Sequence, residues 1–384
     1  MAGKNAALIM AGGEGTRFWP FSTPEFPKQF LDIFLGRSML RITFERINKL
    51  IDTEDIFVIT NRRYEKITWA ELPELPAENI LLEPEKRNTF PAIAYFTYRF
   101  SDNYPGGSVI VLAADHIINN EVRFLDICKQ AFTLAEETRG IVTLGILPDR
   151  PETNYGYLFP HKYEETQAIH HGDAIEFIEK PDLQTAVKYL KSGGYFWNSG
   201  IFTFPFNTFI NETEKISPRD HGLLMRYAKE ANDIDELFKE ITADSVDYMI
   251  MERSDNIKML KAEFGWDDVG NWEALFRLRP EKNNMVLINA VTVNCSNSII
   301  VSKNIPIRAV GMHDTVFVVN GDKILLSSLK GLAAIKSALA SKNDSDLGAR
   351  NITVKGFKPE ILLLDIEGIV IEKMTDGILI RKTV

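Results

Sequence analysis

The chain has 384 residues, 45% of them hydrophobic and 25% charged, a composition typical of a folded protein with more than one structural unit. Its formal net charge of −9 argues against a nucleic-acid-binding surface. No apolar run approaches the roughly 20 residues that cross a bilayer. The N-terminal residues lack the pattern of a signal peptide. The two cysteines, Cys128 and Cys295, are too few for a disulfide framework. We therefore expect a cytoplasmic protein that binds neither nucleic acid nor membranes.

The first half of the chain alternates short apolar runs with segments of helical spacing. The runs predict strands at residues 6–11, 56–60, 80–82, 108–113, 141–147 and 174–178. The spacing predicts helices at residues 38–51, capped by Ser38, at 91–100, beginning at Pro91, and at 122–138. Strands that alternate with helices indicate an α/β fold with a mostly parallel sheet flanked by helices.

The pattern changes towards the C-terminus. Residues 206–279 are mostly helical, with one strand at 258–264, and the segments after residue 283 are mostly strand-like. We expect those strands at residues 286–293, 298–302, 315–319, 324–327, 360–371 and 377–380, a helix at 331–340 and a polar linker at 341–348. The change predicts two domains, residues 1–282 and a small β-rich domain at residues 283–384.

A faint internal repeat lies in the second domain. Residues 314–327, DTVFVVNGDKILLS, resemble residues 366–381 if gaps are allowed. Stacked β coils, as in a β-helix, would explain the similarity, and so would two independent hairpins.

A glycine-rich loop, GGEGTR, follows the first predicted strand at residues 12–17. Gly12, Gly13 and Gly15 let the backbone approach a phosphate, whose oxygens Thr16 and Arg17 can bind. The loop matches neither the mononucleotide pattern ending in Gly-Lys-Ser/Thr nor the dinucleotide pattern G-x-G-x-x-G. It therefore predicts either an anion-binding loop or an ordinary tight turn.

Charged residues elsewhere in the chain are further candidates for binding phosphate or a metal ion. Lys28 lies in a loop stiffened by proline and is either a second phosphate ligand or a solvated surface lysine. Asp115 follows an apolar strand, where a carboxylate can bind Mg²⁺ or serve as a turn residue. Asp267 and Asp268 are adjacent, so only one of them is expected to face a metal site.

Polar residues near later strands suit a sugar phosphate. Glu179 and Lys180 are candidates for binding hydroxyls and phosphate, or form a surface ion pair. Asn198 carries both donors and an acceptor, and Gly156 permits close backbone approach. For His116 we favour a structural role over that of a base. The six histidines show neither zinc-ligand spacing nor a nucleophile pattern.

In combination, these motifs resemble the sugar-phosphate nucleotidyltransferase family, in its guanylyl-transferring branch. The resemblance covers residues 6–278 and rests on GGEGTRFWPFS, PKQF, EPEKRNTFPAI, AADH, ETNYGY, FIEKPD, FWNSGIF, SVDYMIME and WDDVGNW, in this order. It implies a Rossmann-like catalytic domain followed by a small β domain. The reaction it implies is transfer of GMP from GTP to mannose 1-phosphate with Mg²⁺.

The resemblance also implies a role for each matching residue. Arg17 and Lys28 would act on the triphosphate, which the loop would hold, and Asp115 and Asp268 would bind the metal. The remaining matches are nucleotide contacts at Gly12, Gly13, Gly15, Thr16, Glu83, Asn88, Thr89 and Pro91, and sugar-phosphate contacts at Gly156, Glu179, Lys180 and Asn198. Phe90 and Asn154 replace smaller residues of the family pattern, and Phe90 is expected to reshape the base pocket.

Other interpretations stay open from the sequence. The base or sugar could differ, or the chain could be a non-catalytic subunit that senses sugar nucleotides. A fused metal-dependent isomerase is disfavoured, because His313 is the only histidine after Leu278. The exposed edges expected in the β-rich domain favour a homodimer.

Overall fold

A computed structural model describes residues 3–13, 15–32, 36–165, 170–228, 234–278, 283–340 and 346–383. By their contacts they form two compact units, Met1–Gly12 with Leu40–Asp267 and Gly13–Met39 with Asp268–Val384. The predicted domain boundary adjoins residues 279–282, which lie outside the described residues, and it stays a prediction. Residues 341–345 of the predicted linker also lie outside them. Within the described ranges, no helix has both the length and the apolar character needed to span a bilayer.

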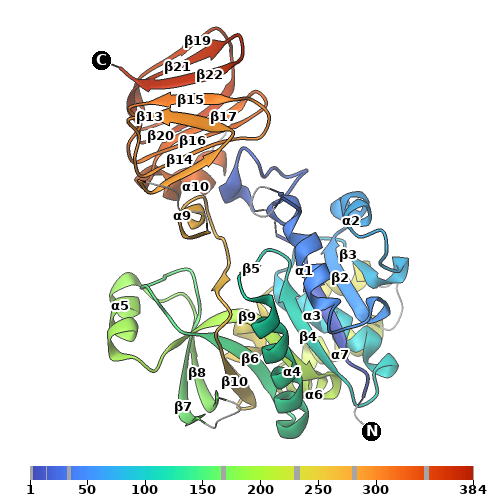
Figure 1. Ribbon diagram of the computed structural model, residues 1–384. Coiled ribbons are helices and arrows are strands. Elements are labelled where there is room, and N and C mark those ends of the chain that lie inside the picture. Colours follow the sequence, from blue (N-terminus) through green and yellow to red (C-terminus); the bar gives the residue numbers. More distant parts are fainter. Residues whose placement is uncertain are drawn as a thin grey trace. The chain divides into compact units, whose positions relative to one another are not determined.

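The first unit is built around a nine-stranded sheet (Figure 1). Its strands are β1 (Ala6–Met10), β2 (Ile56–Asn61), β3 (Ile80–Glu83), β4 (Ser108–Ala113), β6 (Ile141–Ile146), β7 (Tyr157–Glu165), β8 (His170–Ile178), β9 (Phe196–Pro205) and β10 (Ile257–Ala262). The order is β3-β2-β1-β4-β9-β6-β10-β8-β7, and only β8 and β9 run against the others. This confirms the predicted mixed, mostly parallel sheet.

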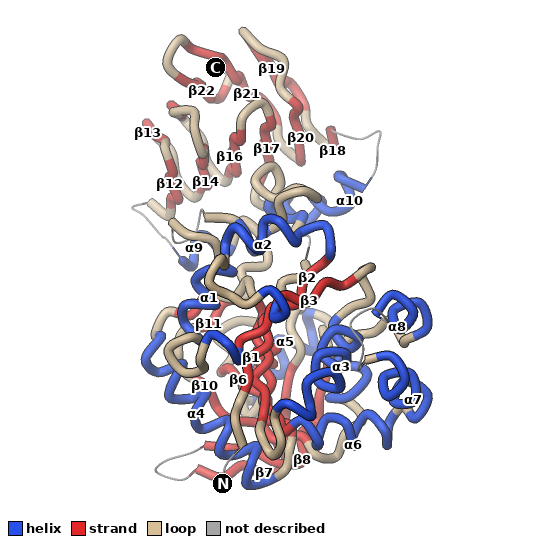
Figure 2. Tube along the Cα trace, turned by 90° about the vertical axis from the view of Figure 1, so that its right-hand side faces the viewer, coloured by secondary structure: helices blue, strands red, loops and turns tan. Residues whose placement is uncertain are grey.

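Helices cover both faces of this sheet (Figure 2). The described helices of this unit are α1 (Met39–Ile47), α2 (Glu65–Glu71), α3 (Thr89–Phe100), α4 (Glu121–Thr138), α5 (Leu183–Ser192), α6 (Phe206–Ile216), α7 (Pro218–Tyr227), α8 (Ile234–Glu240) and a π-helix (Asp247–Met251). The main core cluster joins α3, α6, α7 and α8 to one face, while α4 packs on the other. Ala6, Ala7, Leu8 and Ile9 are fully buried, because side chains on both faces of β1 are covered.

Two helix boundaries differ from their predictions. The helix predicted to reach residue 51 ends at Ile47, where the chain tightens and the Leu50 amide donates to the Ile47 carbonyl (2.9 Å). Ile51 nevertheless remains buried. The helix expected to begin at Pro91 starts two residues earlier, because Asn88 caps it by accepting from the Thr89 amide (3.0 Å).

The second unit carries two stacked sheets that share one core (Figure 1). One contains β12 (Met285–Ile288), β14 (Ser298–Ser302), β16 (Thr315–Asn320), β17 (Lys323–Ser328), β20 (Glu360–Leu364) and β18 (Asp346–Leu347). The other contains β13 (Ala290–Val293), β15 (Ile307–Val310), β22 (Gly377–Lys382), β21 (Glu367–Met374) and β19 (Arg350–Lys355). Strands β12 to β16 alternate between the two sheets, and most strand pairs are parallel, which confirms a β-rich, β-helix-like C-terminal region.

Left-handed residues form corners of these coils. The strand predicted at residues 286–293 is divided into β12 and β13 by Asn289, whose φ is 53°. Asparagine tolerates this conformation better than most residues, so the chain can turn from one sheet to the other. The two similar segments form the antiparallel hairpins β16–β17 and β21–β22, and these hairpins lie within the stack of coils. Two short helices complete the unit, α9 (Ala274–Leu278) and α10 (Ile335–Ala340).

Candidate active site

The glycine-rich loop turns sharply after β1 and enters a short 3₁₀ helix, η1 (Thr16–Phe18). Gly15 adopts a left-handed conformation with φ 59°, and its carbonyl accepts from the Phe18 amide (3.1 Å) and the Ser22 hydroxyl. A Cβ atom at Gly15 would lie 2.2 Å from Cβ of Lys28. Glycine is therefore required here both by the conformation and by the close approach of Lys28.

Two predicted cations and one predicted metal ligand converge within the second unit. Lys28 is almost fully buried, and its Nζ donates to the Asp268 carbonyl (2.6 Å). A Cβ atom built on Gly270 would lie 3.5 and 3.6 Å from the Asp268 carboxylate oxygens and 3.8 Å from Nη1 of Arg17. Lys28 is thus a buried, directed cation rather than a solvated surface lysine. Arg17, Lys28 and Asp268 form one cluster, although Lys28 and Asp268 are 240 residues apart in sequence.

Glu83 is a buried carboxylate at the end of β3 in the first unit. One of its oxygens would lie 3.1 Å from a Cβ atom on Gly12. Burial raises the pKa of Glu83 to about 7, and the nearby Lys86 opposes this shift only in part. Within the described ranges, no hydrogen bond to this carboxylate is found.

The residues that follow Glu83 organise the start of α3. Asn88, with φ 70°, caps the helix, and the Thr89 hydroxyl accepts from the Val246 amide (2.9 Å). Pro91 lies in the first turn. Phe90 is fully buried in the hydrophobic core, and its expected effect on the base pocket stays a prediction.

Asp115 follows β4, at the carboxyl end of a central strand, and is half-buried. The chain then forms β5 (Ile117–Ile118), which pairs with β11 (Trp266–Asp267). Asp267 lies opposite Ile117 and is buried. Nε1 of Trp266 donates to Nδ1 of His116 (3.2 Å), a contact that supports the structural role expected for His116.

Three predicted sugar-binding residues meet at the ends of β7, β8 and β9. The Asn198 amide donates to the Gly156 carbonyl (2.8 Å), and a Cβ atom on Gly156 would lie 2.6 Å from Oε2 of Glu179. Glu179 is largely buried and forms an ion pair with Lys180, whose own side chain is exposed. Lys180 also adopts a left-handed conformation, with φ 47°. Asn198 lies within β9 and is not a turn residue.

A family model described as nucleotidyl transferase matches residues 6–284. The chain belongs to this nucleotidyl transferase family. It is 34% identical to a mannose-1-phosphate guanylyltransferase of Salmonella typhimurium over 92% of this chain and 75% of that protein. It is 35% identical to a mannose-1-phosphate guanylyltransferase of Klebsiella pneumoniae over 86% of this chain and 72% of that protein.

Two solved structures are also similar to this nucleotidyl transferase. One, from Thermus thermophilus, is titled mannose-1-phosphate geranyltransferase and has a TM-score of 0.77 at 28% identity, over 88% of this chain and 98% of that chain. The other, from Helicobacter pylori, is titled mannose-6-phosphate isomerase and has a TM-score of 0.56 at 25% identity, over 69% of this chain and 99% of that chain.

Two residues with no predicted role fix the side chain of Asn198. The Thr143 hydroxyl donates to Oδ1 of Asn198 (2.8 Å), and Nδ2 of Asn198 donates to Oδ1 of Asp247 (2.9 Å). Burial and the nearby Glu179 raise the pKa of Asp247 to about 6. Asp247 starts the π-helix, an uncommon element that often marks functional sites. Its sequence signal was the motif SVDYMIME, which supported the family resemblance without assigning Asp247 a role.

Aromatic side chains connect the region of Asp115 with that of Asn198. Tyr155 packs edge-on against Trp266 (5.1 Å between ring centroids) and against Trp197 (5.2 Å). The Arg150 guanidinium lies over the ring of Trp197 at 4.7 Å. Trp266, Tyr155 and Trp197 therefore form a continuous row of rings within the first unit. Trp266 packs at one end of this row.

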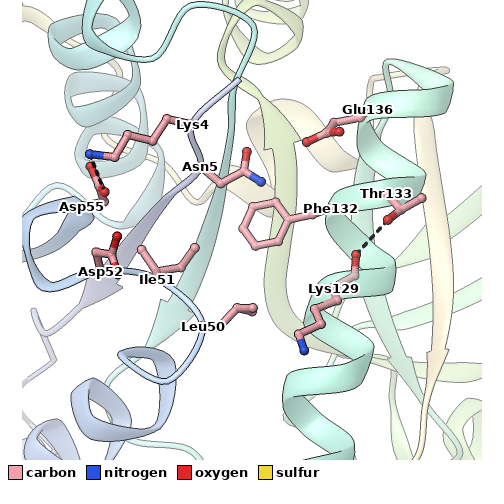
Figure 3. Close-up of a pocket in the computed structure, with 10 residues that line it drawn as sticks. All are labelled: Lys4, Asn5, Leu50, Ile51, Asp52, Asp55, Lys129, Phe132, Thr133 and Glu136. Atoms are coloured by element: carbon pink, nitrogen blue, oxygen red, sulfur yellow. Dashed lines mark hydrogen bonds and ion pairs between the residues drawn. The ribbon is translucent and has the colours of Figure 1, made fainter. Parts of the chain in front are cut away.

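A hollow of about 410 Å³ lies beside the amino-terminal ends of β1 and β2 (Figure 3), whereas Asp115 follows the carboxyl end of β4. Lys4 and Asn5 precede β1, Asp52 and Asp55 precede β2, and α4 supplies Lys129, Phe132, Thr133 and Glu136. Lys4 pairs with Asp55 at 2.8 Å. The lining mixes two cations with three carboxylates and contains none of the predicted site residues. It is therefore separate from the candidate active site.

Proposed function

We propose that this nucleotidyl transferase transfers GMP from GTP to mannose 1-phosphate, forming GDP-mannose and pyrophosphate. The observation that carries the proposal is the convergence of Arg17, Lys28 and Asp268 around Gly270. Two cations beside a carboxylate suit a triphosphate bound together with a metal ion. The choice of guanine and mannose is supported by the names of the Salmonella and Klebsiella relatives.

The nucleophile in this reaction is a phosphate oxygen of mannose 1-phosphate. It forms a bond to the α-phosphorus of GTP, and the bond between that phosphorus and the bridging oxygen breaks, so that pyrophosphate leaves. The attacking oxygen is already anionic, so no general base is needed. Arg17 and Lys28 offset the negative charge on the α-phosphate and the leaving group, and catalysis rests on positioning and charge stabilisation.

Asp115 and Asp268 are the residues we propose to hold Mg²⁺. Both carboxylates are half-buried and therefore reachable from solvent. Within the described ranges, no group of three or more histidine, cysteine or carboxylate side chains could hold a metal. The two carboxylates of Asp115 and Asp268 fit Mg²⁺, which usually binds one or two carboxylates together with substrate phosphates. When bound, the ion would neutralise charge on the triphosphate.

The sugar phosphate would bind at Gly156, Glu179, Lys180 and Asn198. The Asn198 oxygen accepts from Thr143 and from the Gly200 amide (3.2 Å), and one of its two N–H groups is used by Asp247. The second N–H group then serves as a donor to a hydroxyl. Glu179 accepts hydroxyl hydrogen bonds, while Lys180 provides a cation for the phosphate.

Glu83 supports guanine as the base. A carboxylate accepts hydrogen bonds, and guanine carries N–H donors on the edge that a protein can read. Binding such donors would also supply the partners that the buried carboxylate lacks within the described residues. Asn88, Thr89 and Pro91 would shape the backbone beside the base.

Product identification tests the proposed reaction. The full chain is incubated with GTP, mannose 1-phosphate and Mg²⁺, and the products are analysed by mass spectrometry. We expect GDP-mannose and pyrophosphate in equal amounts, and no GDP-mannose in EDTA. Tight GTP binding with no product would favour the non-catalytic subunit instead. Conversion of mannose 6-phosphate to fructose 6-phosphate would favour the isomerase activity for which the Helicobacter protein is named.

We also propose a homodimer formed through the β-rich domain. The edge strand β13 exposes Val291 (64%) and Val293 (65%), and such strands can pair with a second chain. Light scattering after size-exclusion chromatography should give a dimeric mass for the full chain and a monomeric mass for a chain ending near Arg279. A monomeric mass for both would contradict this assembly.

A further inference from the structure

The glycine-rich loop is bonded to the C-terminal β domain inside the second unit. Asn320, the last residue of β16, donates from Nδ2 to the carbonyl of Pro20 (2.9 Å), across 300 positions of sequence. Pro20 is buried and lies three residues after Arg17. The hydrogen bond therefore joins the β domain to the segment that carries a predicted phosphate ligand.

Other contacts hold the same loop within the second unit. Helix α10 packs against η1, the turn that contains Thr16 and Arg17. Nε1 of Trp272 donates to the Trp19 carbonyl (3.1 Å), and its ring packs on Phe18 at 5.2 Å. Lys303 also pairs with Asp32 (3.3 Å), but both side chains are too exposed for the pair to contribute much.

Short-range hydrogen bonds connect the residues beside Pro20 to the phosphate-binding turn, so that holding Pro20 in place also restrains the turn. The Trp19 amide donates to the Thr16 carbonyl (3.1 Å), and the Ser22 amide donates to the Phe18 carbonyl (3.0 Å). The Ser22 hydroxyl reaches back to the Gly15 carbonyl. Residues on both sides of Pro20 are thus tied to the turn at residues 15–18, and a shift of Pro20 would move that turn.

Asn320 is itself held on a rigid element. It is the last residue of β16, at the turn of the β16–β17 hairpin, where it pairs with Lys323 of β17. Its neighbours Val318 and Val319 are fully buried. A donor fixed in this way can hold the loop at a smaller entropic cost than a flexible side chain could.

We propose that Asn320 is a positioning residue for nucleotide binding, through which the C-terminal β domain holds the phosphate-binding loop in its binding shape. The inference rests on the proposed function only in naming GTP as the ligand. A loop that is already ordered needs less ordering when the triphosphate binds, so loss of the hydrogen bond should weaken GTP binding and leave the sugar phosphate unaffected.

The test compares the full-length wild type with Asn320→Asp, which keeps the side-chain shape but replaces the donor by an oxygen that repels the Pro20 carbonyl. Asn320→Ala is the second variant, and it removes the donor without adding charge. Arg308→Gln is the control, because it breaks an ion pair with Asp376 (2.7 Å) in the same domain, and within the described residues Arg308 forms no hydrogen bond or ion pair with the loop. Amide hydrogen exchange, thermal unfolding and both Michaelis constants are measured for each chain.

We expect both Asn320 variants to speed amide exchange at Phe18, Trp19 and Ser22. We also expect the KM for GTP to rise about five- to tenfold, as for the loss of one hydrogen bond, with the KM for mannose 1-phosphate unchanged. Arg308→Gln should match the wild type in all four measurements. Unchanged exchange and GTP affinity in both Asn320 variants would overturn the proposal, as would equal rises of both Michaelis constants with a lower melting temperature.

A wild type that forms no product would count against the proposed function and not against this inference. In that case amide exchange and the calorimetric Kd for Mg-GTP or inorganic triphosphate decide it. Faster exchange in the loop with weaker triphosphate binding in the Asn320 variants would support the positioning role. Wild-type values for both quantities would overturn it.

Discussion

At the scale of single residues, the buried polar groups of the site differ in whether a hydrogen bond offsets the energetic cost of their burial. Lys28 donates to the Asp268 carbonyl, and Asn198 is held by Thr143 and Asp247. Glu83 is as deeply buried as Lys28, yet its carboxylate lacks a hydrogen-bond donor within the described part of the chain. Burying a charge without a partner destabilises a fold, so Glu83 ionises at a cost to the protein without ligand.

Comparison of the wild type with Glu83→Gln should show this cost in the pH dependence of the free energy of unfolding. The pKa of Glu83 is raised from 4.5 to about 7, so the folded state binds the proton more tightly than the unfolded state. Below pH 4.5 Glu83 is protonated in both states, so its titration does not change the free energy of unfolding of the wild type. As the pH rises from 4.5 to 7 this free energy decreases, and above pH 7 the loss reaches its full value of up to about 3 kcal/mol.

The Gln variant does not ionise and avoids this penalty. Its free energy of unfolding should exceed that of the wild type at pH 8, whereas the difference should vanish near pH 4.5. Denaturant unfolding at the two pH values measures both differences. A constant difference at both values would mean that Glu83 does not titrate as described.

The proposed metal ligands are tested by Asp115→Ala and Asp268→Ala. Each should lower turnover by about 10²–10³ or more without unfolding the protein, because charge stabilisation of the triphosphate is lost. Asp126→Ala is a matched control, since Asp126 is exposed on α4 and pairs with Arg123. Initial rates and circular dichroism are recorded for each. Near-normal turnover in either variant would remove that residue from the metal site.

At the scale of elements, the apolar runs predicted β1, β2 and β4 well because both faces of these strands are buried. β9 was missed, because Asn198, Ser199 and Gly200 resemble a turn within an otherwise aromatic strand. Its place between β4 and β6 comes from antiparallel pairing with strands distant in sequence. Local spacing also failed to predict the corner at Asn289, because a single left-handed residue leaves no periodic signal.

The glycine-rich loop depends on its conformation as well as on its side chains. Gly15→Ala would place a Cβ atom 2.2 Å from Cβ of Lys28 in a left-handed conformation that alanine disfavours. Both Cβ atoms are bonded directly to the backbone, so a side-chain rotation cannot relieve the clash and the loop must shift. We expect a loss of about 10² or more in kcat/KM for GTP, since small displacements of positioning groups have effects of this size. Gly36→Ala is the control, because it shares the positive φ (75°) but its Cβ would meet no atom of the described residues within 4 Å. Equal rates for the two variants would contradict the requirement at Gly15.

At the scale of the whole molecule, the site residues come from segments that the sequence does not place together. Lys28 and Asp268 meet across 240 positions and Asn320 and Pro20 across 300, and no local pattern predicts either contact. The family resemblance supplied the candidate residues, while the structure shows which of them cluster within each unit. It also added Thr143 and Asp247, whose roles follow from their hydrogen bonds to Asn198.

The central claim is the identity of the two substrates. The most direct measurement is kcat/KM for pyrophosphate release by the full chain, over a grid of ATP, CTP, GTP, UTP and dTTP against the 1-phosphates of mannose, glucose and galactose. We expect kcat/KM for GTP with mannose 1-phosphate to exceed that of every other pair by at least about 10²-fold, and we expect EDTA to abolish pyrophosphate release. A higher value for another pair, or release that continues in EDTA, would contradict it.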